Sequence, residues 1–423
     1  MRLVDSRRLT GPNLYAREPG AIAEVAWDAA WLDAGGDPDH AIATWRRQFA
    51  RMGVPLYYAA AVVAARRYHG GAALFISGAW DELLPATEIN EWAVASAAAV
   101  IAGEAELPLE PTFTAIQAAL EAARRPRLEA LVRAARAKDI PLLIDDTRLT
   151  LGSGADLIEL PADEILPAPE DIPWAALARM PIALVTGTNG KTTTTRLVAR
   201  IARLAGRHPG NTSSDGVAVD ERFIERGDWS GPDAARLVLR HPGVDLAVLE
   251  VARGGILRRG LAVESVDVAT ITNVSADHLG SYGVDDLATM ARVKAVTAQV
   301  ARTAVLNAED PELVAIAATL TVPVIYFALD PDHPVVAEHV RRGGSAWIVR
   351  DAAITHVHGG RERRVIAVTD APITFGGRAA YNLANALAAA ATATALGLPD
   401  DAVIAGLRTF TSSPADNPGR GNL

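Results

Sequence analysis

A short glycine-rich stretch of this 423-residue chain carries a lysine followed by a threonine, a combination that proteins use to bind phosphate groups. It reads G-T-N-G-K-T from Gly187 to Thr192, and the apolar run Ile182–Val185 precedes it. A strand, a tight turn and a helix in this order direct backbone N–H groups and the positive end of a helix dipole at one anion. Lys191 would then pair with the β- and γ-phosphates of a nucleotide, and the Thr192 hydroxyl would bind Mg²⁺.

The stretch departs from the common phosphate loop G-x-x-x-x-G-K-[ST] at one position. That pattern requires a glycine at 185, where this chain has Val185, and the glycine falls at Gly187 instead. The alternative reading is an ordinary glycine turn with an incidental lysine. Strand, turn, Lys-Thr and helix all agree, however, so we expect a shortened nucleotide-binding loop. Its predicted residues are Gly187, Thr188, Asn189, Gly190, Lys191, Thr192 and Thr193.

Further residues of suitable chemistry follow later apolar runs. Glu250 ends "VLE", Asn273 and His278 lie in "TNVSADH", and Lys294 stands sixteen residues further along, on a predicted helix. Taken singly, each has a plain structural explanation: a cap or ion pair for the glutamate, a loop position for the histidine and a surface position for the lysine. "YNLAN" places Asn382 and Asn385 at a predicted helix start, where Asn385 could simply cap the helix.

The pattern that positions these residues changes along the chain. The first part, to about residue 165, is dominated by helical patterns, including a predicted helix over Thr114–Lys138. Afterwards buried apolar runs alternate with helical segments, which is typical of a doubly wound, mostly parallel α/β sheet. Ligands of such sheets bind at the carboxyl ends of the strands. The expected strands are Ile182–Val185, Leu246–Leu249, Val268–Thr272, Ala304–Leu306 and Val322–Phe327.

These motifs, in their order, resemble the Mur ligase superfamily of ATP-dependent enzymes that join a carboxylate to an amine. The series closes with "NPGR", Asn417 to Arg420. Within the superfamily, "NTSSDGV", "GDWSGP", "ARGGILRRGL", "ITFGGRAAYN" and the opening "LTGPN" are similar to the Mur-ligase-like half of the cyanophycin synthetase family. The resemblance implies a P-loop central domain preceded by a smaller α+β domain. It also implies ATP and Mg²⁺, and a carboxylate activated as an acyl phosphate that an amine then attacks.

The resemblance assigns roles residue by residue. Lys191, Glu250, His278 and Lys294 would be catalytic, with Thr192, Glu250, His278 and Lys294 at the metal ions and Lys294 carbamylated by CO₂. Asn382 would contact adenine, Arg420 the phosphates, and Asn273 the nucleotide. The predicted substrate-binding residues are Ser213, Ser214, Asp215, Arg253 and Arg258. Arg253, Arg258 and Arg259 stand beside a presumed Gly-Gly turn, while His356 and His358 are expected to be exposed in a β-hairpin.

Composition excludes several other classes of protein. The net charge of −9 lacks the basic footprint of a nucleic-acid binder and disfavours anionic membranes. The longest apolar run, Leu56–Ala65, is too short to span a bilayer, and the first residues lack a signal peptide's apolar stretch. The absence of cysteine excludes disulfides, thiolate metal sites and cysteine nucleophiles. We therefore expect a cytoplasmic protein.

The expected domain organisation is an N-terminal domain over 1–165, a central ATP-binding domain over 166–412 and a hinge over 413–423 toward a third domain. "KDIPLLIDDTRLTLGSG" resembles the entry to an ATP-grasp domain, yet only about thirty residues separate it from the phosphate loop. We therefore expect no ATP-grasp domain. We expect a peptidic or small-molecule carboxylate and an amine as substrates, and a homo-oligomer or a partner supplying the third domain is open.

Two alternatives to a ligase stand at this point. One is a non-ligating ATP-binding or regulatory protein that works with another subunit. The other is a plain P-loop kinase or NTPase, which leaves the His278, Lys294 and Asn382 motifs without a role.

Overall fold

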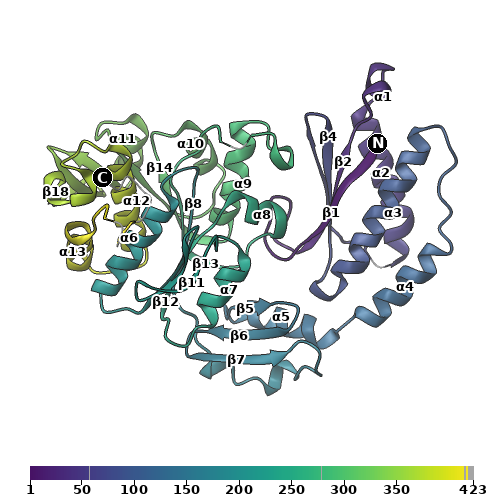
Figure 1. Cartoon of the computed structure of the whole chain (residues 1–423), viewed down its shortest axis with the longest axis horizontal. Helices are drawn as coiled ribbons and strands as arrows, with labels where there is room; N and C mark the ends of the chain where they lie inside the picture. Colours follow the sequence, from purple (N-terminus) through teal and green to yellow (C-terminus); the bar gives the residue numbers. More distant parts are fainter. Residues whose placement is uncertain (57, 278, 414–415, 418–423) are drawn as a thin grey trace.

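The N-terminal part of the chain forms a small antiparallel sheet in the strand order β1-β2-β4-β3. The structure is a computed structural model and describes residues 1–56, 58–277, 279–413 and 416–417. The strands are β1 (Arg2–Leu9), β2 (Gly20–Ala26), β3 (Val63–Tyr68) and β4 (Gly71–Ser77). Helices α2 (Pro38–Gly53) and α3 (Leu83–Ile101) pack on one face of this sheet, and the short α1 (Ala29–Asp33) follows β2 (Figure 1).

Two helices replace the single one predicted over Thr114–Lys138. Helix α4 (Thr112–Ala123) ends before Pro126, and α5 (Pro126–Ala137) begins at it. The prediction of one helix was wrong because proline has no N–H to donate and forces the preceding residue out of helical geometry. The amphipathic pattern continues across the break, since Leu120, Leu128 and Leu131 are all buried.

A second small sheet connects the two main parts of the molecule. Its antiparallel strands are β5 (Leu142–Ile144), β6 (Arg148–Ser153) and β7 (Asp156–Pro161). In Figure 1 it lies below the other two sheets, next to α5. Arg240, at the end of a helix that packs on the third sheet, anchors the small sheet to the rest of the molecule. The Arg240 Nε donates to Thr150 Oγ1 over 2.8 Å, and the guanidinium also pairs with Asp145.

The third sheet has eleven strands in the order β11-β10-β9-β12-β8-β13-β14-β15-β16-β17-β18. The seven strands from β9 to β16 in this order are parallel, and antiparallel strands complete both edges. The expected doubly wound, mostly parallel α/β sheet is thus confirmed, and the five predicted strands correspond to β8, β12, β13, β14 and β15. The strands are β8 (Ile182–Thr186), β9 (Pro209–Ser213), β10 (Gly216–Val219), β11 (Arg222–Arg226), β12 (Leu246–Glu250), β13 (Val266–Ile271), β14 (Ala301–Asn307), β15 (Val324–Ala328), β16 (Ser345–Arg350), β17 (Ala353–His358) and β18 (Arg361–Ala367).

Helices cover both faces of this sheet, and each face has its own core. Successive residues of a strand point to opposite faces, so Leu184 lies in one core while Ala183 and Val185 lie in the other. The first core includes α7 (Pro232–Arg240), α8 (Arg253–Arg259), α9 (Leu287–Gln299), α10 (Pro311–Ala317) and α11 (Pro334–Arg341). The second includes α6 (Lys191–Leu204), α12 (Ala380–Ala395) and α13 (Asp400–Thr409).

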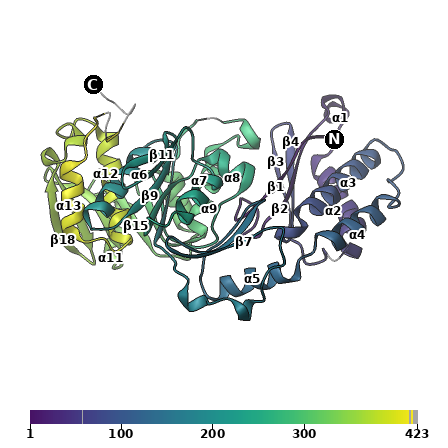
Figure 2. The same ribbon diagram turned by 60° about the horizontal axis from the view of Figure 1, so that its bottom comes forward.

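The N-terminal sheet docks on the first of these helical layers. Figures 1 and 2 both show β1 and the loop after it beside α8. The Thr10 N–H donates to the Arg259 carbonyl over 2.7 Å, and the Leu261 N–H donates to the Pro12 carbonyl over 2.8 Å. Among the described residues, the helices are all too short or too polar to cross a membrane.

Candidate active site

The glycine-rich loop joins β8 to α6, as the sequence predicts, and its glycines are required by space as well as by conformation. Gly190 has φ +84°, and a Cβ there would lie 2.1 Å from the Asn385 Oδ1. A Cβ at Gly187 would lie 1.8 Å from the Thr272 Oγ1. The loop is therefore a tight backbone cradle, held by side chains from β13's end and from α12, with a shape that a larger residue would fill.

Residues after β13 hold the loop from one side. The Asn273 Oδ1 accepts from the Asn189 N–H over 3.0 Å, and the Asn273 Nδ2 donates to the Asn189 carbonyl over 3.1 Å. The Thr272 hydroxyl donates to the same carbonyl over 2.6 Å. The structure thus places Asn273, predicted to bind the nucleotide, on the backbone of the loop. Its amide fixes the conformation of the loop from behind.

A hydroxyl and a carboxylate meet at the start of α6. The Thr192 Oγ1 donates to the Glu250 Oε2 over 2.8 Å and lies 3.4 Å from the Ser214 Oγ. Glu250 ends β12, next to β8 in the sheet, and it is buried. Three hard oxygen donors therefore converge where the sequence predicts a metal ion. Mg²⁺ takes oxygen ligands of this kind, so the donor set fits it.

Lys191 lies over the loop with its Nζ 3.1 Å from the Gly187 carbonyl and 3.0 Å from the Thr188 carbonyl. Lys294, on α9, is almost completely buried nearby. Burial, with the positive charges of Lys191 and Arg253, lowers the Lys294 pKa to about 7, although Asp277 and Asp310 oppose the shift. At neutral pH a large part of this lysine is a neutral amine, which an ordinary surface lysine is not.

The predicted substrate residues separate into two groups. Ser214 lies beside Thr192, and Asp215 pairs with Arg196 of α6 over 2.9 Å. Ser213 instead is completely buried, and its hydroxyl donates to the Gly216 carbonyl within the turn. Its side chain therefore supports the turn.

Helix α8 carries the predicted arginines in place of the presumed Gly-Gly turn. Gly254 and Gly255 are part of this helix, so that expectation was wrong. Burial lowers the Arg253 pKa, and Asp277 opposes this effect. Arg258 is exposed, and its Nε donates to the Gly254 carbonyl over 3.1 Å. Arg253 thus faces the Lys294 region, whereas Arg258 follows the helix surface.

Two asparagines of α12 occupy different surroundings. Asn385 lies against the glycine-rich loop at Gly190, as described above, so it is more than a helix cap. Asn382 is buried, and its Nδ2 donates to the Ile373 carbonyl over 2.9 Å.

The histidines of the β-hairpin are not equally exposed. His356 is half-buried, stacks on Trp347 at 4.8 Å between ring centroids, and pairs with the Ser345 hydroxyl over 2.8 Å. Its expected exposure was wrong because His356 lies opposite Trp347 of β16, and the two rings cover each other. His358, two residues later, is exposed as expected.

Comparison with known proteins identifies the part of the chain that contains this arrangement. Residues 185–393, just under half of the chain, match the Mur ligase middle domain family. Residues 185–393 are a Mur ligase middle domain.

The proteins to which the chain is similar include cyanophycin synthetases. The chain is 46% identical over 254 residues to cyanophycin synthetase of Synechocystis sp., covering 59% of this chain and 29% of the relative. Over 243 residues it is 31% identical to UDP-N-acetylmuramoylalanine–D-glutamate ligase of Nitrosococcus oceani, covering 57% and 46%. The chain thus spans less than a third of the length of the cyanophycin synthetases that it matches.

Solved structures of ligases align with part of the chain. A UDP-N-acetylmuramoyl-L-alanyl-D-glutamate–2,6-diaminopimelate ligase aligns with 56% of this chain and 47% of its own, at 20% identity and a TM-score of 0.43. A pseudomurein peptide ligase type C from Methanothermus fervidus aligns with 56% and 50%, at 24% identity and a TM-score of 0.39.

Two predicted site residues, His278 and Arg420, lie outside the described residues. The structure adds others that the sequence reading did not single out. Asp310 caps α10 and accepts from the Val274 N–H over 2.6 Å, and Asn417 is completely buried against the Thr193 hydroxyl. Asn417 belongs to the quoted "NPGR", a signal that could have identified it. Asp310 had no comparable motif.

Proposed function

We propose that this protein is an ATP-dependent ligase that joins a carboxylate to an amine and releases ADP. The observation that carries the proposal is the cluster at the carboxyl ends of β8, β12 and β13, within a Mur ligase middle domain. There a glycine loop, Lys191, the Thr192–Glu250 pair and a buried lysine with a lowered pKa lie together. The similarity to cyanophycin synthetases supports an amino acid as the amine and a peptidic carboxylate as the acid.

Each residue has a place in the proposed reaction. The backbone N–H groups from Gly187 to Thr192 bind the phosphates, and Lys191 turns from the loop carbonyls to the phosphoryl group that is transferred. The acid becomes an acyl phosphate, and the amine displaces phosphate from it. Thr192 and Glu250 would hold Mg²⁺, which neutralises phosphate charge when bound. We assign 166–412 to this ATP-binding unit, 1–165 to the part before it and 413–423 to a hinge.

Lys294 has a separate proposed role as a carbamate. The reaction with CO₂ needs the neutral amine, which the pKa of about 7 supplies at neutral pH. A carbamate would convert the cation into an anion beside Lys191 and Arg253, the two positive charges that lower its pKa. The repulsion between Lys294 and these two cations would then be replaced by attraction between the carbamate and the same two cations.

The test measures ADP release with each substrate omitted in turn. We expect turnover that requires ATP, Mg²⁺, an acid and an amine together, and we expect Lys191→Ala to abolish it. Turnover by Lys191→Ala at the wild-type rate would refute the site assignment. ATP binding without acid-dependent turnover would refute the ligase and favour the non-ligating ATP-binding protein.

A further inference from the structure

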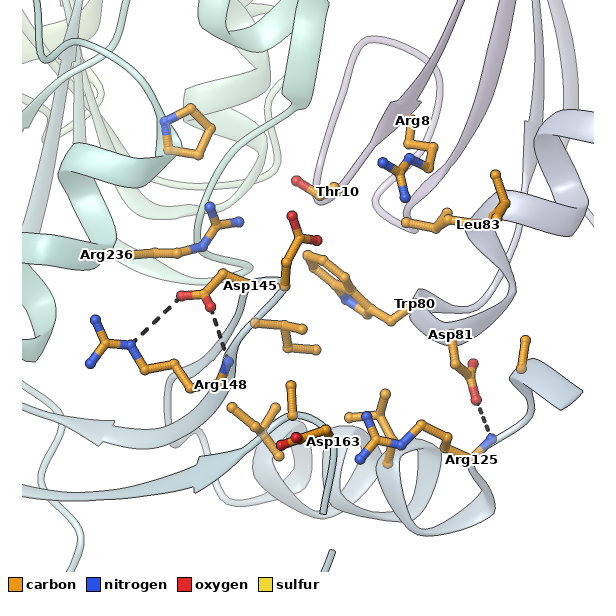
Figure 3. Close-up of a pocket in the computed structure, with 18 of the residues that line it drawn as sticks. Arg8, Thr10, Trp80, Asp81, Leu83, Arg125, Asp145, Arg148, Asp163 and Arg236 are labelled. Atoms are coloured by element: carbon orange, nitrogen blue, oxygen red, sulfur yellow. Dashed lines mark hydrogen bonds and ion pairs between the residues drawn. The ribbon is translucent and has the colours of Figure 1, made fainter. Parts of the chain in front are cut away.

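Charged side chains gather at two junctions of the molecule. The first is a cleft of about 440 Å³ between the N-terminal sheet, the small β5-β6-β7 sheet and α7, lined by five arginines and five aspartates. Figure 3 shows Asp145 in contact with Arg148 there, and Asp81 in contact with the Arg125 N–H. Opposite charges are therefore equal in number in this cleft. The second junction differs, because it joins α6, the helix of the glycine-rich loop, to the chain after α13.

Two arginines of α6 hold the chain after α13. Arg196 and Arg200 are four residues apart, so they share one face of the helix. The Arg200 Nη2 donates to the Asp416 Oδ1 over 2.7 Å, and the same guanidinium pairs with Glu221. The Arg196 Nη1 donates to the Asp416 carbonyl over 3.4 Å, and its Nη2 pairs with Asp215 over 2.9 Å. Asp416 is thus held to α6 by its side chain and by its backbone.

Asp416 also organises its own segment. Its Oδ2 accepts from the Thr411 N–H over 2.9 Å and from the Thr411 hydroxyl over 2.6 Å. The side chains of Asp416 and Arg200 are 15% and 18% exposed, so water competes little for their pair. Burial alone would raise the Asp416 pKa, but the hydrogen bonds from Thr411 and Arg200 outweigh it and lower the pKa. The carboxylate is therefore charged at neutral pH and able to hold its arginine.

The residue after Asp416 reaches the start of α6. Asn417 is completely buried, and its Nδ2 donates to the Thr193 Oγ1 over 3.2 Å, while its Oδ1 lies 3.3 Å from the same hydroxyl. Thr193 follows Thr192, which we propose as a Mg²⁺ ligand. A buried amide cannot leave this position without losing its hydrogen bonds. One continuous set of contacts thus runs from α6 through the segment after α13 and back to the beginning of α6.

We propose that Arg200 and Asp416 are positioning residues of the nucleotide site, which hold Asn417 against Thr193 and thereby fix the start of α6 for phosphate binding. This inference rests on the proposed function, which places ATP on the glycine-rich loop. The two residues act through Asn417 rather than on the nucleotide itself. Because coupling between two sites is reciprocal, ATP bound at the loop also strengthens the hold on the segment after α13.

The first test is titration calorimetry of ATP with Mg²⁺, without acid or amine. We expect Arg200→Gln to weaken ATP binding about tenfold and Asn417→Ala to weaken it by a similar factor, since each removes one link of the same set of contacts. The double variant Arg200→Gln/Asn417→Ala is expected to bind like the weaker single variant. A purely structural loss at two separate places would instead be additive.

Arg203→Gln is the matched control. Arg203 lies on the same helix, and its side chain also pairs with Glu221, but within the described part of the chain it has no contact with the segment after α13. This variant is expected to bind ATP as the wild type does.

Amide hydrogen exchange at Thr411 measures the hold itself, with no ATP present. Arg200→Gln is expected to speed this exchange at least tenfold, since the Thr411 N–H donates to the carboxylate that Arg200 holds. Saturating ATP should slow the exchange in the wild type and leave it unchanged in Arg200→Gln.

Three results would overturn the inference: unchanged Thr411 exchange in Arg200→Gln, an equal loss of ATP affinity in Arg203→Gln, or additive losses in the double variant. Faster Thr411 exchange with unchanged ATP affinity would also overturn it and would leave the proposed function intact. ATP binding that depends on Arg200, without acid-dependent ADP release, would sink the ligase and keep the positioning role.

Discussion

The environment of Lys294 strongly disfavours the positive charge of its side chain. Its pKa falls from 10.5 to about 7 because it is buried near Lys191 and Arg253. One pKa unit corresponds to about 1.4 kcal/mol, so charging this lysine in the folded state costs several kcal/mol. Such a cost has no benefit for folding, which is typical of a group kept for chemistry.

We predict that Lys294→Met loses ligation yet raises the free energy of unfolding by roughly 2–4 kcal/mol at pH 7 in CO₂-free buffer. The folded-state pKa lies below the unfolded one, so the penalty is complete below pH 7 and fades as pH approaches 10.5. Denaturant melts at pH 7 and pH 10 measure this, and the gap between variant and wild type should shrink at pH 10. A variant less stable than the wild type at pH 7 would contradict the explanation.

The ligation activity of a second variant, Lys294→Ala, tests whether Lys294 acts as a carbamate. Lys294→Ala should lose activity, and short carboxylic acids added to the assay should restore part of it by placing an anion in the vacated space. A fully active Lys294→Ala would refute the carbamate.

Gly190 shows why the glycine-rich loop has no room for a side chain at this position. A Cβ would meet the Asn385 Oδ1 at 2.1 Å, and φ is +84°. We predict that Gly190→Ala lowers ATP affinity at least tenfold. Gly206→Ala is the matched control, since φ is +78° there and nothing lies within 4 Å of the added Cβ. Both variants carry left-handed strain of about 1–2 kcal/mol, so equal ATP affinities in titration calorimetry would show that the contact with Asn385 is unimportant.

At the residue scale, the sequence indicates which residues share an edge of the sheet, but it does not indicate the contacts that each side chain makes. Thr192 and Glu250 could be placed together because the strands before them are parallel neighbours, whose carboxyl ends share an edge. The contacts of Asn273 with the loop, and the burial of Ser213, depend on the direction of each side chain, which no spacing determines.

Among the elements, the turn η5 (Ser281–Gly283) is held by a distant strand. Arg66, on β3, donates to the Tyr282 carbonyl over 2.7 Å and also to the Gly283 carbonyl. Tyr282 has φ +54°, and the Arg7 guanidinium lies 5.0 Å from the centre of its ring. A non-glycine residue in this conformation persists only where its surroundings enforce it. The N-terminal sheet thus fixes the turn η5.

We predict that Arg66→Ala speeds amide hydrogen exchange at residues 281–284 at least tenfold and lowers kcat more than it changes the KM for ATP. Arg67→Ala is the control, because the side chain of Arg67 pairs with Asp39 and not with the turn. Unchanged exchange at the turn would refute the bracing role.

These element contacts explain what the sequence could not reveal. Arg66 and Tyr282 are more than two hundred residues apart, and nothing local marks them as partners. The small β5-β6-β7 sheet was also not predicted, because its short strands lie in a segment that resembles a domain entry. By contrast, the chemistry of Pro126 alone is sufficient to predict the break between α4 and α5.

At the scale of the whole molecule, a close backbone contact joins the N-terminal region to the chain after α8. Gly11 passes so close to the chain after α8 that an added Cβ would lie 2.0 Å from the Leu261 carbonyl oxygen. The hydrogen bonds of Thr10 and Pro12 flank this point. Because both sides are backbone, neither can rotate away, and the docking of the two parts requires glycine there.

We therefore predict that Gly11→Ala weakens the docking of the N-terminal region and leaves the proposed nucleotide site intact. Protease sensitivity between residues 1 and 20 should rise several-fold, since the loop after β1 can no longer pack against the backbone at Arg259–Leu261. ATP affinity should stay within about twofold, because the phosphate loop is held by β13 and α12. Gly243→Ala is the control, as its Cβ meets only the end of the His241 side chain. If Gly11→Ala lost ATP binding as well, the nucleotide site would depend on the docked N-terminal sheet, and the two parts would have to be treated as one functional unit.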